Sequence, residues 1–138
     1  MGRGQYIRAF SPIFFRARAV SMSDFTIYHN PRCSKSRQTL QLLEQHGIEP
    51  EVVLYLEQSP SIKQLKALLK KLGLPARDLL RKGEDEYCTL GLADSALSED
   101  ALIEAMHAHP KLIERPIVVR GSHAVLGRPP ENVLELID

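Results

Sequence analysis

The hydrophobic pattern of the first third of the chain predicts a strand, a helix and a second strand. The short apolar run Phe25–Tyr28 is typical of a strand. Leucines recur three positions apart within residues 34–46, which predicts a helix that ends at Gly47. The valine-rich run 51–55 predicts the second strand. In one sheet, two such strands run parallel and are joined by a right-handed crossover.

The middle of the chain is predicted to be helical. Apolar residues recur at helical spacing over Ile62–Leu72, with lysines on the remaining surface. A short second helix is expected to open at Pro75 and to run toward Arg81. A third helix is expected to begin at Ser98, an N-cap followed by acidic residues, and to end near His109.

The last third changes back to the period of a strand. Residues 116–119 and His123–Leu126 are β-prone runs on either side of Gly121 and Ser122, which predicts a hairpin with a two-residue II′ turn. A final helix is expected over residues 131–137, after two prolines. The order βαβ, helical insertion, ββα predicts an α/β fold with one mixed sheet.

The domain organisation follows from these elements. A single domain is expected over residues 22–138, with the helical insertion at about 59–113. Residues 1–21 form a leader with four arginines and no acidic residue, as in mitochondrial transit peptides, but without the uninterrupted apolar core of a secretory signal. Because Met22 lies just before the first strand, we favour a natural start at Met22. The leader is then an upstream extension that is disordered or not native.

Composition and charge exclude several classes of partner. Hydrophobic residues make up 43% and charged residues 25%, as in ordinary globular proteins. Four of the 18 basic residues lie in the leader, whereas all 17 acidic residues follow it, so the domain carries a net charge of −3. A slightly acidic domain does not suit nucleic acid, and no apolar run reaches the ~18 residues of a membrane span. We expect neither partner.

The two cysteines indicate a reduced compartment. Two are too few for a disulfide-stapled secreted scaffold, and their spacing forms no zinc pattern, so we expect a cytoplasmic protein without a metal site. Cys88 has no basic residue beside it and is expected to be structural or incidental.

Residues 28–37 carry the candidate chemistry. Cys33 follows a strand and directly precedes a helix, where unpaired N–H groups and the helix dipole stabilise a thiolate and also bind anions. Arg32, Lys35 and Arg37 add positive charge. An isolated cysteine is more often a small buried hydrophobe, but these polar neighbours argue against a place in the apolar core. We expect a nucleophilic cysteine beside an oxyanion site.

Ser36 stands where a dithiol redox motif would have its second cysteine. Any redox cycle of Cys33 must therefore be resolved by an external thiol, or by Cys88 through a rearrangement that nothing in the sequence supports.

Three distant arginines lie in settings that suit an anion pocket: Arg81, Arg115 and Arg128. Arginine binds tetrahedral oxyanions bidentately and keeps its charge. Arg115 and Arg128 each directly precede a proline, where a cis peptide can form. Taken singly, each arginine is more often a solvated surface residue, and composition alone does not gather them into one site.

Five separated segments resemble the successive signatures of the glutaredoxin-coupled arsenate reductase family. In order they are residues 27–37, 54–57, 79–82, 115–119 and 127–130. The resemblance spans residues 24–138 and implies a thioredoxin-like fold with a helical insertion.

The resemblance also implies roles for individual residues. Cys33 would attack arsenate to form a covalent thiolate–arsenic adduct, while the three arginines hold the oxyanion. His29, Asn30 and Ser36 would support the nucleophile, and Ser36 could donate a hydrogen bond to the thiolate. Glutathione would act as co-substrate, glutaredoxin would clear the resulting mixed disulfide, and no cofactor would stay bound.

Alternatives remain open at this point. The run around Cys33 is more basic than the usual arsenate-reducing version and resembles a housekeeping subgroup, so the substrate could be another small oxyanion or a thiol. A polymerase-binding redox adaptor of the same fold would use a cysteine pair to sense oxidants, and Ser36 removes that pair; such an adaptor would not need the three arginines. A monothiol glutaredoxin would have a Gly-Phe pair after the cysteine and a double glycine near the C-terminus, and the sequence has neither.

Overall fold

The computed structural model describes residues 24–137, so the expected leader lies outside the described residues. In chain order the elements are β1 (Phe25–Tyr28), α2 (Ser34–Gln45), β2 (Glu51–Val53), α3 (Ile62–Leu72), α4 (Ala76–Leu79), α5 (Asp85–Thr89), α6 (Glu99–Ala108), the 3₁₀ helix η1 (Pro110–Leu112), β3 (Ile117–Arg120), β4 (His123–Leu126) and the 3₁₀ helix η2 (Pro130–Leu136).

The strands form one mixed sheet, which confirms the predicted fold class. Their order is β2-β1-β3-β4, with β1 parallel to β2 and the other two pairs antiparallel. Arg120 pairs with His123 across a two-residue turn in which Gly121 has a φ of 61°, as the predicted hairpin requires. Within residues 24–137, no helix is both long and apolar enough to cross a bilayer.

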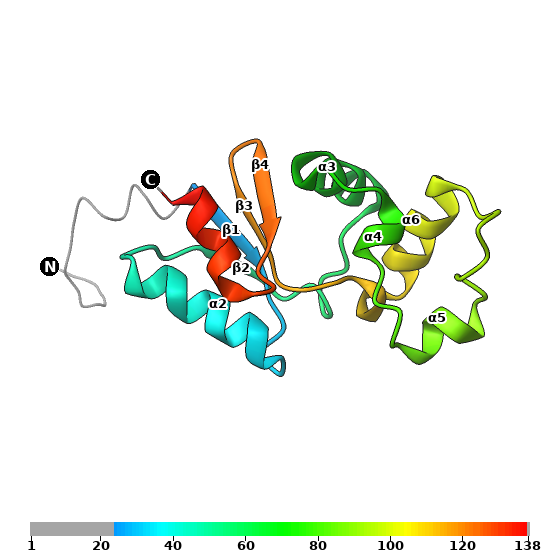
Figure 1. Ribbon diagram of the computed structural model, residues 1–138, viewed down its shortest axis with the longest axis horizontal. Helices are drawn as coiled ribbons and strands as arrows, with labels where there is room; N and C mark the ends of the chain where they lie inside the picture. The colour runs from blue at the N-terminus through cyan, green and yellow to red at the C-terminus, as the bar shows by residue number, and fades with distance from the viewer. Residues whose placement is uncertain (1–23, 138) are drawn as a thin grey trace, which may run out of the picture.

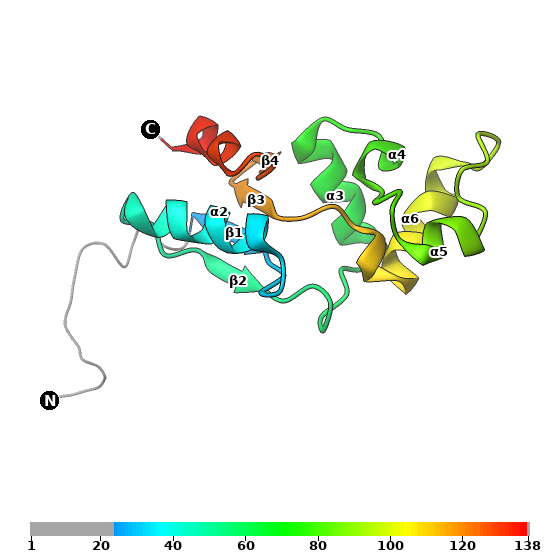
Figure 2. The same ribbon diagram turned by 60° about the horizontal axis from the view of Figure 1, so that its bottom comes forward.

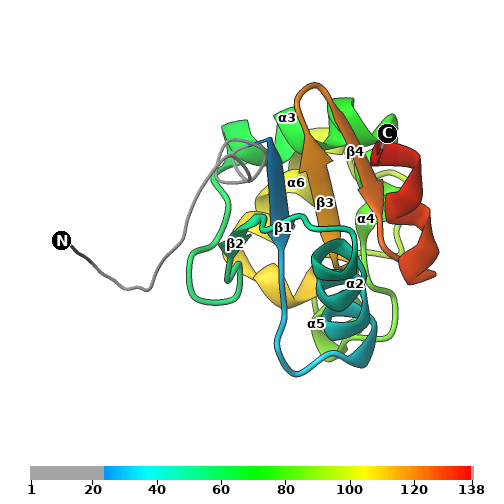
Figure 3. The same cartoon turned by 90° about the vertical axis from the view of Figure 1, so that its left-hand side faces the viewer.

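Helical layers cover both faces of the sheet. Figure 3 shows α2 and η2 on one face, and α3 and α6 behind the other. The central strand β3 is therefore apolar throughout its first three residues: Val118 packs toward α2 and η2, whereas Ile117 and Val119 pack into the cluster of the helical insertion. Two apolar cores result, one on each side of a single sheet.

The helical insertion extends beyond the sheet and contacts it through α3 (Figures 1 and 2). Two caps define its helices. The Gln64 N–H donates to the Ser61 hydroxyl at 3.1 Å, while the Ser61 N–H donates to the Gln64 side chain at 2.8 Å, forming a capping box on α3. Ser98 accepts from the Ala101 N–H and caps α6, as the sequence predicts.

Some boundaries differ from the sequence prediction. Strand β2 ends at Val53 rather than at residue 55, because the chain turns where the Glu57 and Gln58 N–H groups donate to the Leu54 carbonyl. Tyr55 is consequently buried, at 1% exposure. The final helix is 3₁₀ rather than α, as the i+3 hydrogen bond from the Asn132 N–H to the Pro129 carbonyl shows.

The short helices α5 and η1 were not predicted from the sequence. They have five and three residues, which is too short for a hydrophobic period to show.

Candidate active site

Cys33 is the N-cap residue of α2, at the helix start where the sequence predicts it. Its backbone is extended, with φ −95° and ψ 123°, and its carbonyl accepts the first helical hydrogen bond from the Arg37 N–H at 3.0 Å. The side chain makes no capping hydrogen bond, so the sulfur is free to point away from the helix. Cys33 is only 9% exposed, yet it belongs to neither apolar core, because arginine side chains lie beneath it.

A buried polar cluster holds the loop in front of Cys33. The Ser36 hydroxyl accepts from the Asn30 N–H at 3.0 Å and lies 2.7 Å from Nδ1 of His29. Asn30 in turn accepts from the Arg32 N–H through Oδ1 at 3.0 Å. Among the described side chains, the hydrogen-bond donor to the Cys33 sulfur is Arg128, so the structure shows Ser36 supporting the loop and not bonded to the thiol.

The site of His29 makes folding stability depend on pH. Burial lowers the pKa of His29, and the positive charge of Arg37 lowers it further. Below about pH 6.5 His29 binds a proton in the unfolded chain more strongly than in the folded chain. The free energy of unfolding therefore decreases as the pH is lowered through this window. We expect His29→Gln to remove this part of the slope between about pH 7 and pH 5.

Urea denaturation at several pH values measures that slope. His46→Gln is the matched control, since His46 is an exposed histidine outside the buried cluster. A slope that is the same in wild type and His29→Gln would show that His29 does not couple to folding.

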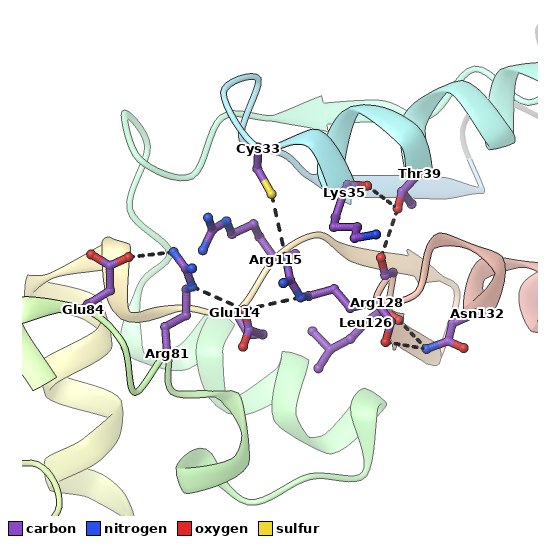
Figure 4. A network of polar contacts seen from close by, with 11 residues as sticks. Cys33, Lys35, Thr39, Arg81, Glu84, Glu114, Arg115, Leu126, Arg128 and Asn132 are labelled. Atoms are coloured by element: carbon purple, nitrogen blue, oxygen red, sulfur yellow. Dashed lines mark hydrogen bonds and ion pairs between the residues drawn. The ribbon is translucent and has the colours of Figure 1, made fainter.

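The three arginines meet beneath the Cys33 sulfur (Figure 4). Arg128 Nη1 lies 3.9 Å from the sulfur and donates to the Arg115 carbonyl at 3.4 Å. Arg81 comes from the insertion and donates through Nη1 to Glu84 at 2.6 Å. Both the Arg115–Pro116 and the Arg128–Pro129 bonds are cis. Folding thus gathers three side chains that the sequence alone left as separate candidates.

Arg115 is the member of this group whose charge is least compensated by hydrogen bonds. Its Nε and Nη1 atoms are buried, and neither has a hydrogen-bond partner among the described residues. A buried N–H without an acceptor is costly, and the cost is greater for a charged group. The side chain nevertheless points toward the space between Cys33 and Arg81, which is the arrangement of a site prepared for an anion.

Two further acidic residues belong to the site and were missed in the sequence. Glu114 Oε1 lies 3.4 Å from Arg81 Nε and 3.8 Å from Arg128 Nε, while Glu84 pairs with the far end of Arg81. The sequence signal that could have found Glu114 is its position directly before Arg115. Among the described residues, no group of three His, Cys, Asp or Glu side chains could hold a metal ion.

Close packing at Gly127 fixes the segment that carries Arg128. The Gly127 N–H donates to the Pro116 carbonyl at 2.9 Å, and its own carbonyl accepts from Thr39 of α2 at 3.2 Å. Asn132 donates to the carbonyls of Leu126 and Arg128 at 3.0 and 3.2 Å. The loop is therefore tied to α2, to η2 and to the residue that directly precedes β3.

A side chain at Gly127 would break this packing. An added Cβ would lie 2.6 Å from Thr39 Oγ1 and 2.8 Å from Pro116 Cγ. We expect Gly127→Ala to lower the free energy of unfolding by about 1–3 kcal/mol, measured by urea denaturation. Gly83→Ala is the control, since nothing lies within 4 Å of its Cβ and a change below about 0.5 kcal/mol is expected. Equal effects of the two substitutions would contradict the argument.

Comparison with known proteins decides the family. The model of the ArsC family matches residues 28–136, which is most of the chain and includes Cys33 and the three arginines. The chain belongs to the ArsC family.

The matches between this ArsC protein and its named relatives cover nearly the whole length of those relatives. An arsenate reductase of Haemophilus influenzae is 48% identical over 112 residues, covering 80% of this chain and 97% of that protein. A protein of Escherichia coli K12 called uncharacterized protein YfgD is 62% identical, covering 80% of this chain and 94% of the other. The solved structure of an arsenate reductase from Vibrio cholerae is 58% identical with a TM-score of 0.81, over 82% and 97% of the two chains.

Proposed function

We propose that this ArsC-family protein is a glutathione- and glutaredoxin-dependent arsenate reductase that acts through a covalent cysteine–arsenic adduct. The observation that carries the proposal is the Cys33 sulfur above three arginine side chains, one of which has buried N–H groups without an acceptor. A tetrahedral oxyanion would supply those acceptors and present its central atom to the sulfur. Relatives named arsenate reductases, at 46–50% identity, favour arsenate as that oxyanion.

The proposed chemistry begins with Cys33 as the nucleophile. Its sulfur attacks arsenic, one oxygen leaves as water, and the Cys33–S–As(V) adduct forms without a change of oxidation state. The arginines stabilise the negative charge on the remaining oxygens, as fixed donors do in other acyl- and phosphoryl-transfer sites.

An external thiol completes the proposed cycle. Glutathione attacks the adduct at arsenic and displaces a second oxygen as water, and a glutaredoxin thiol then attacks the glutathione sulfur. The new S–S bond leaves the electron pair of the broken As–S bond on arsenic, which becomes As(III). Water releases arsenite and frees the Cys33 thiol. We place the reaction in the cytoplasm, where thiols stay reduced.

The position of Cys88 supports the use of an outside thiol. Cys88 is exposed on α5, which Figures 1 and 2 place at the far end of the insertion from α2. With Ser36 in place of a neighbouring cysteine, no second thiol of residues 24–137 lies near Cys33. Glutathione is accordingly proposed as a co-substrate and not as a bound cofactor.

The test is arsenate-dependent oxidation of NADPH by the purified protein in the presence of glutathione, glutaredoxin and glutathione reductase. We expect oxidation that requires arsenate, glutathione and glutaredoxin together. Other tetrahedral oxyanions would meet the same guanidinium groups, so phosphate serves as competitor and further oxyanions as substrates. Oxidation that depends on another oxyanion but not on arsenate would reassign the substrate, and oxidation with no oxyanion dependence would refute the proposal.

A further inference from the structure

Glu114 places a carboxylate inside a cluster of guanidinium groups. Its Oε1 atom lies 3.4 Å from Arg81 Nε and 3.8 Å from Arg128 Nε, and its side chain is 26% exposed. Figure 4 shows it on the side of the arginines away from Cys33. Together with Glu84, it leaves the three-arginine cluster with one excess positive charge.

The backbone fixes this position. The Glu114 N–H donates to the Leu79 carbonyl at 2.8 Å, and the Arg81 N–H donates to the Leu112 carbonyl at 2.7 Å. These two bonds flank an antiparallel bridge between Leu80 and Ile113. Glu114 and Arg81 thus lie diagonally across the bridge, and both side chains are held on the same face of it whatever they bind.

The contacts of Glu114 are those of a counter-ion that can be displaced. Its buried Oε1 makes no hydrogen bond, and both of its ion pairs are long. Glu84, by contrast, accepts a hydrogen bond from Arg81 Nη1 at 2.6 Å. The Nε groups that face Glu114 are among the donors that a bidentate oxyanion needs. An oxyanion bound below the Cys33 sulfur would draw the same guanidinium groups away from Glu114, so the carboxylate and the oxyanion compete for their positive charge.

We propose that Glu114 is a positioning residue that competes with the substrate oxyanion for Arg81 and Arg128 and so sets the affinity of the site. The inference rests on the proposed function, in that the arginine cluster is taken as the substrate site. A dianion can displace a single carboxylate, because it carries more charge to the same donors. Arsenous acid is neutral at physiological pH and cannot displace the carboxylate. Glu114 therefore pairs again with Arg81 and Arg128 once the product has formed, and this favours product release.

Removing the carboxylate makes a prediction of definite sign. Glu114→Gln keeps the size of the side chain and raises the positive potential of the site by about one charge. Binding of a dianion should become about tenfold tighter, and binding of a monoanion should change less, since the interaction scales with the ligand charge. If Glu114 instead served only to brace the arginines, its removal would weaken both.

Isothermal titration calorimetry on Cys33→Ser protein tests this without turnover. Arsenate and phosphate, at a mildly alkaline pH where both are dianions, are compared with monoanionic dimethylarsinate in the presence and absence of Glu114→Gln. Glu114→Asp keeps the charge and should leave dianion affinity within about threefold of the parent. Glu104→Gln, on an exposed position of α6, is the matched control and should change nothing.

The outcomes separate this proposal from the proposed function. Tighter dianion binding in Glu114→Gln supports it, as does a lower KM for arsenate without a higher kcat in protein that retains Cys33. Unchanged or weaker dianion binding overturns it, and so does an equal gain for the monoanion. Absence of binding in every variant overturns the premise of an oxyanion site. If the coupled assay fails while these changes in binding are observed, the result contradicts the proposed arsenate reduction and leaves the role of Glu114 supported.

Discussion

Cys33→Ser is expected to lower the rate of the proposed arsenate reduction by at least about 10³-fold, because serine at this position lacks the thiolate nucleophile that the proposed arsenic adduct requires. The substitution changes one buried atom at the N-cap of α2, where serine is itself a favourable capping residue. Thermal denaturation should therefore show a folded protein. The loss of activity would then report on chemistry and not on folding.

Cys88→Ser is the matched control for this experiment. Cys88 is the other free cysteine of the described residues and is exposed on α5. Its replacement should leave the rate within about twofold, since the proposed cycle draws its second thiol from glutathione. A large loss in Cys88→Ser, or substantial activity in Cys33→Ser, would overturn the assignment of the nucleophile.

Arg115→Met is expected to lower kcat/KM for arsenate by about 10²–10³-fold while making the folded protein more stable. The guanidinium of Arg115 has two buried nitrogen atoms without a hydrogen-bond partner, and it lies beside two other arginines. Methionine fills similar space without those unpaired donors or the charge repulsion. The free energy of unfolding should rise by about 1 kcal/mol in urea denaturation.

Arg77→Met should give the opposite pattern and so serves as the control. Arg77 donates to the Leu92 and Asp94 carbonyls at 2.9 Å each, within the insertion and away from Cys33. Its loss should lower stability by about 1 kcal/mol and leave the rate of reduction unchanged. If Arg115→Met were instead less stable than wild type, the argument that the unpaired guanidinium of Arg115 destabilises the folded protein would be wrong.

The sequence predicts those parts of the molecule that depend on neighbours along the chain. The strand before Cys33, the helix after it and the hairpin around Gly121 each depend on a few adjacent residues, and all three are found. The meeting of Arg81 with Arg128 depends on hydrogen bonds between segments that are distant in sequence. No local period encodes such contacts, so only the family resemblance brought these arginines together before the structure did.

The differences between the predicted and the observed structure also have physical causes. Residues 51–55 look like one strand because Tyr55 is β-prone. The chain turns after Val53, however, and the Tyr55 side chain packs into the core of the insertion. Glu114 was passed over because a single acid beside an arginine is common on protein surfaces. Its burial is set by the bridge between Leu80 and Ile113, which no pattern in either segment announces.

That bridge also divides the insertion into parts that differ in their tolerance of length changes. The hydrogen bonds at Arg81 and Glu114 close residues 82–111 into a loop whose two ends are fastened together at the site. Extra residues in the exposed stretch 93–96 would lengthen a loop that is already closed, at small entropic cost. One residue added beside Leu80 or Ile113 would instead turn Arg81 or Glu114 to the opposite face. Diversity among proteins of this architecture should therefore collect at the tip of the insertion and be scarce at its base.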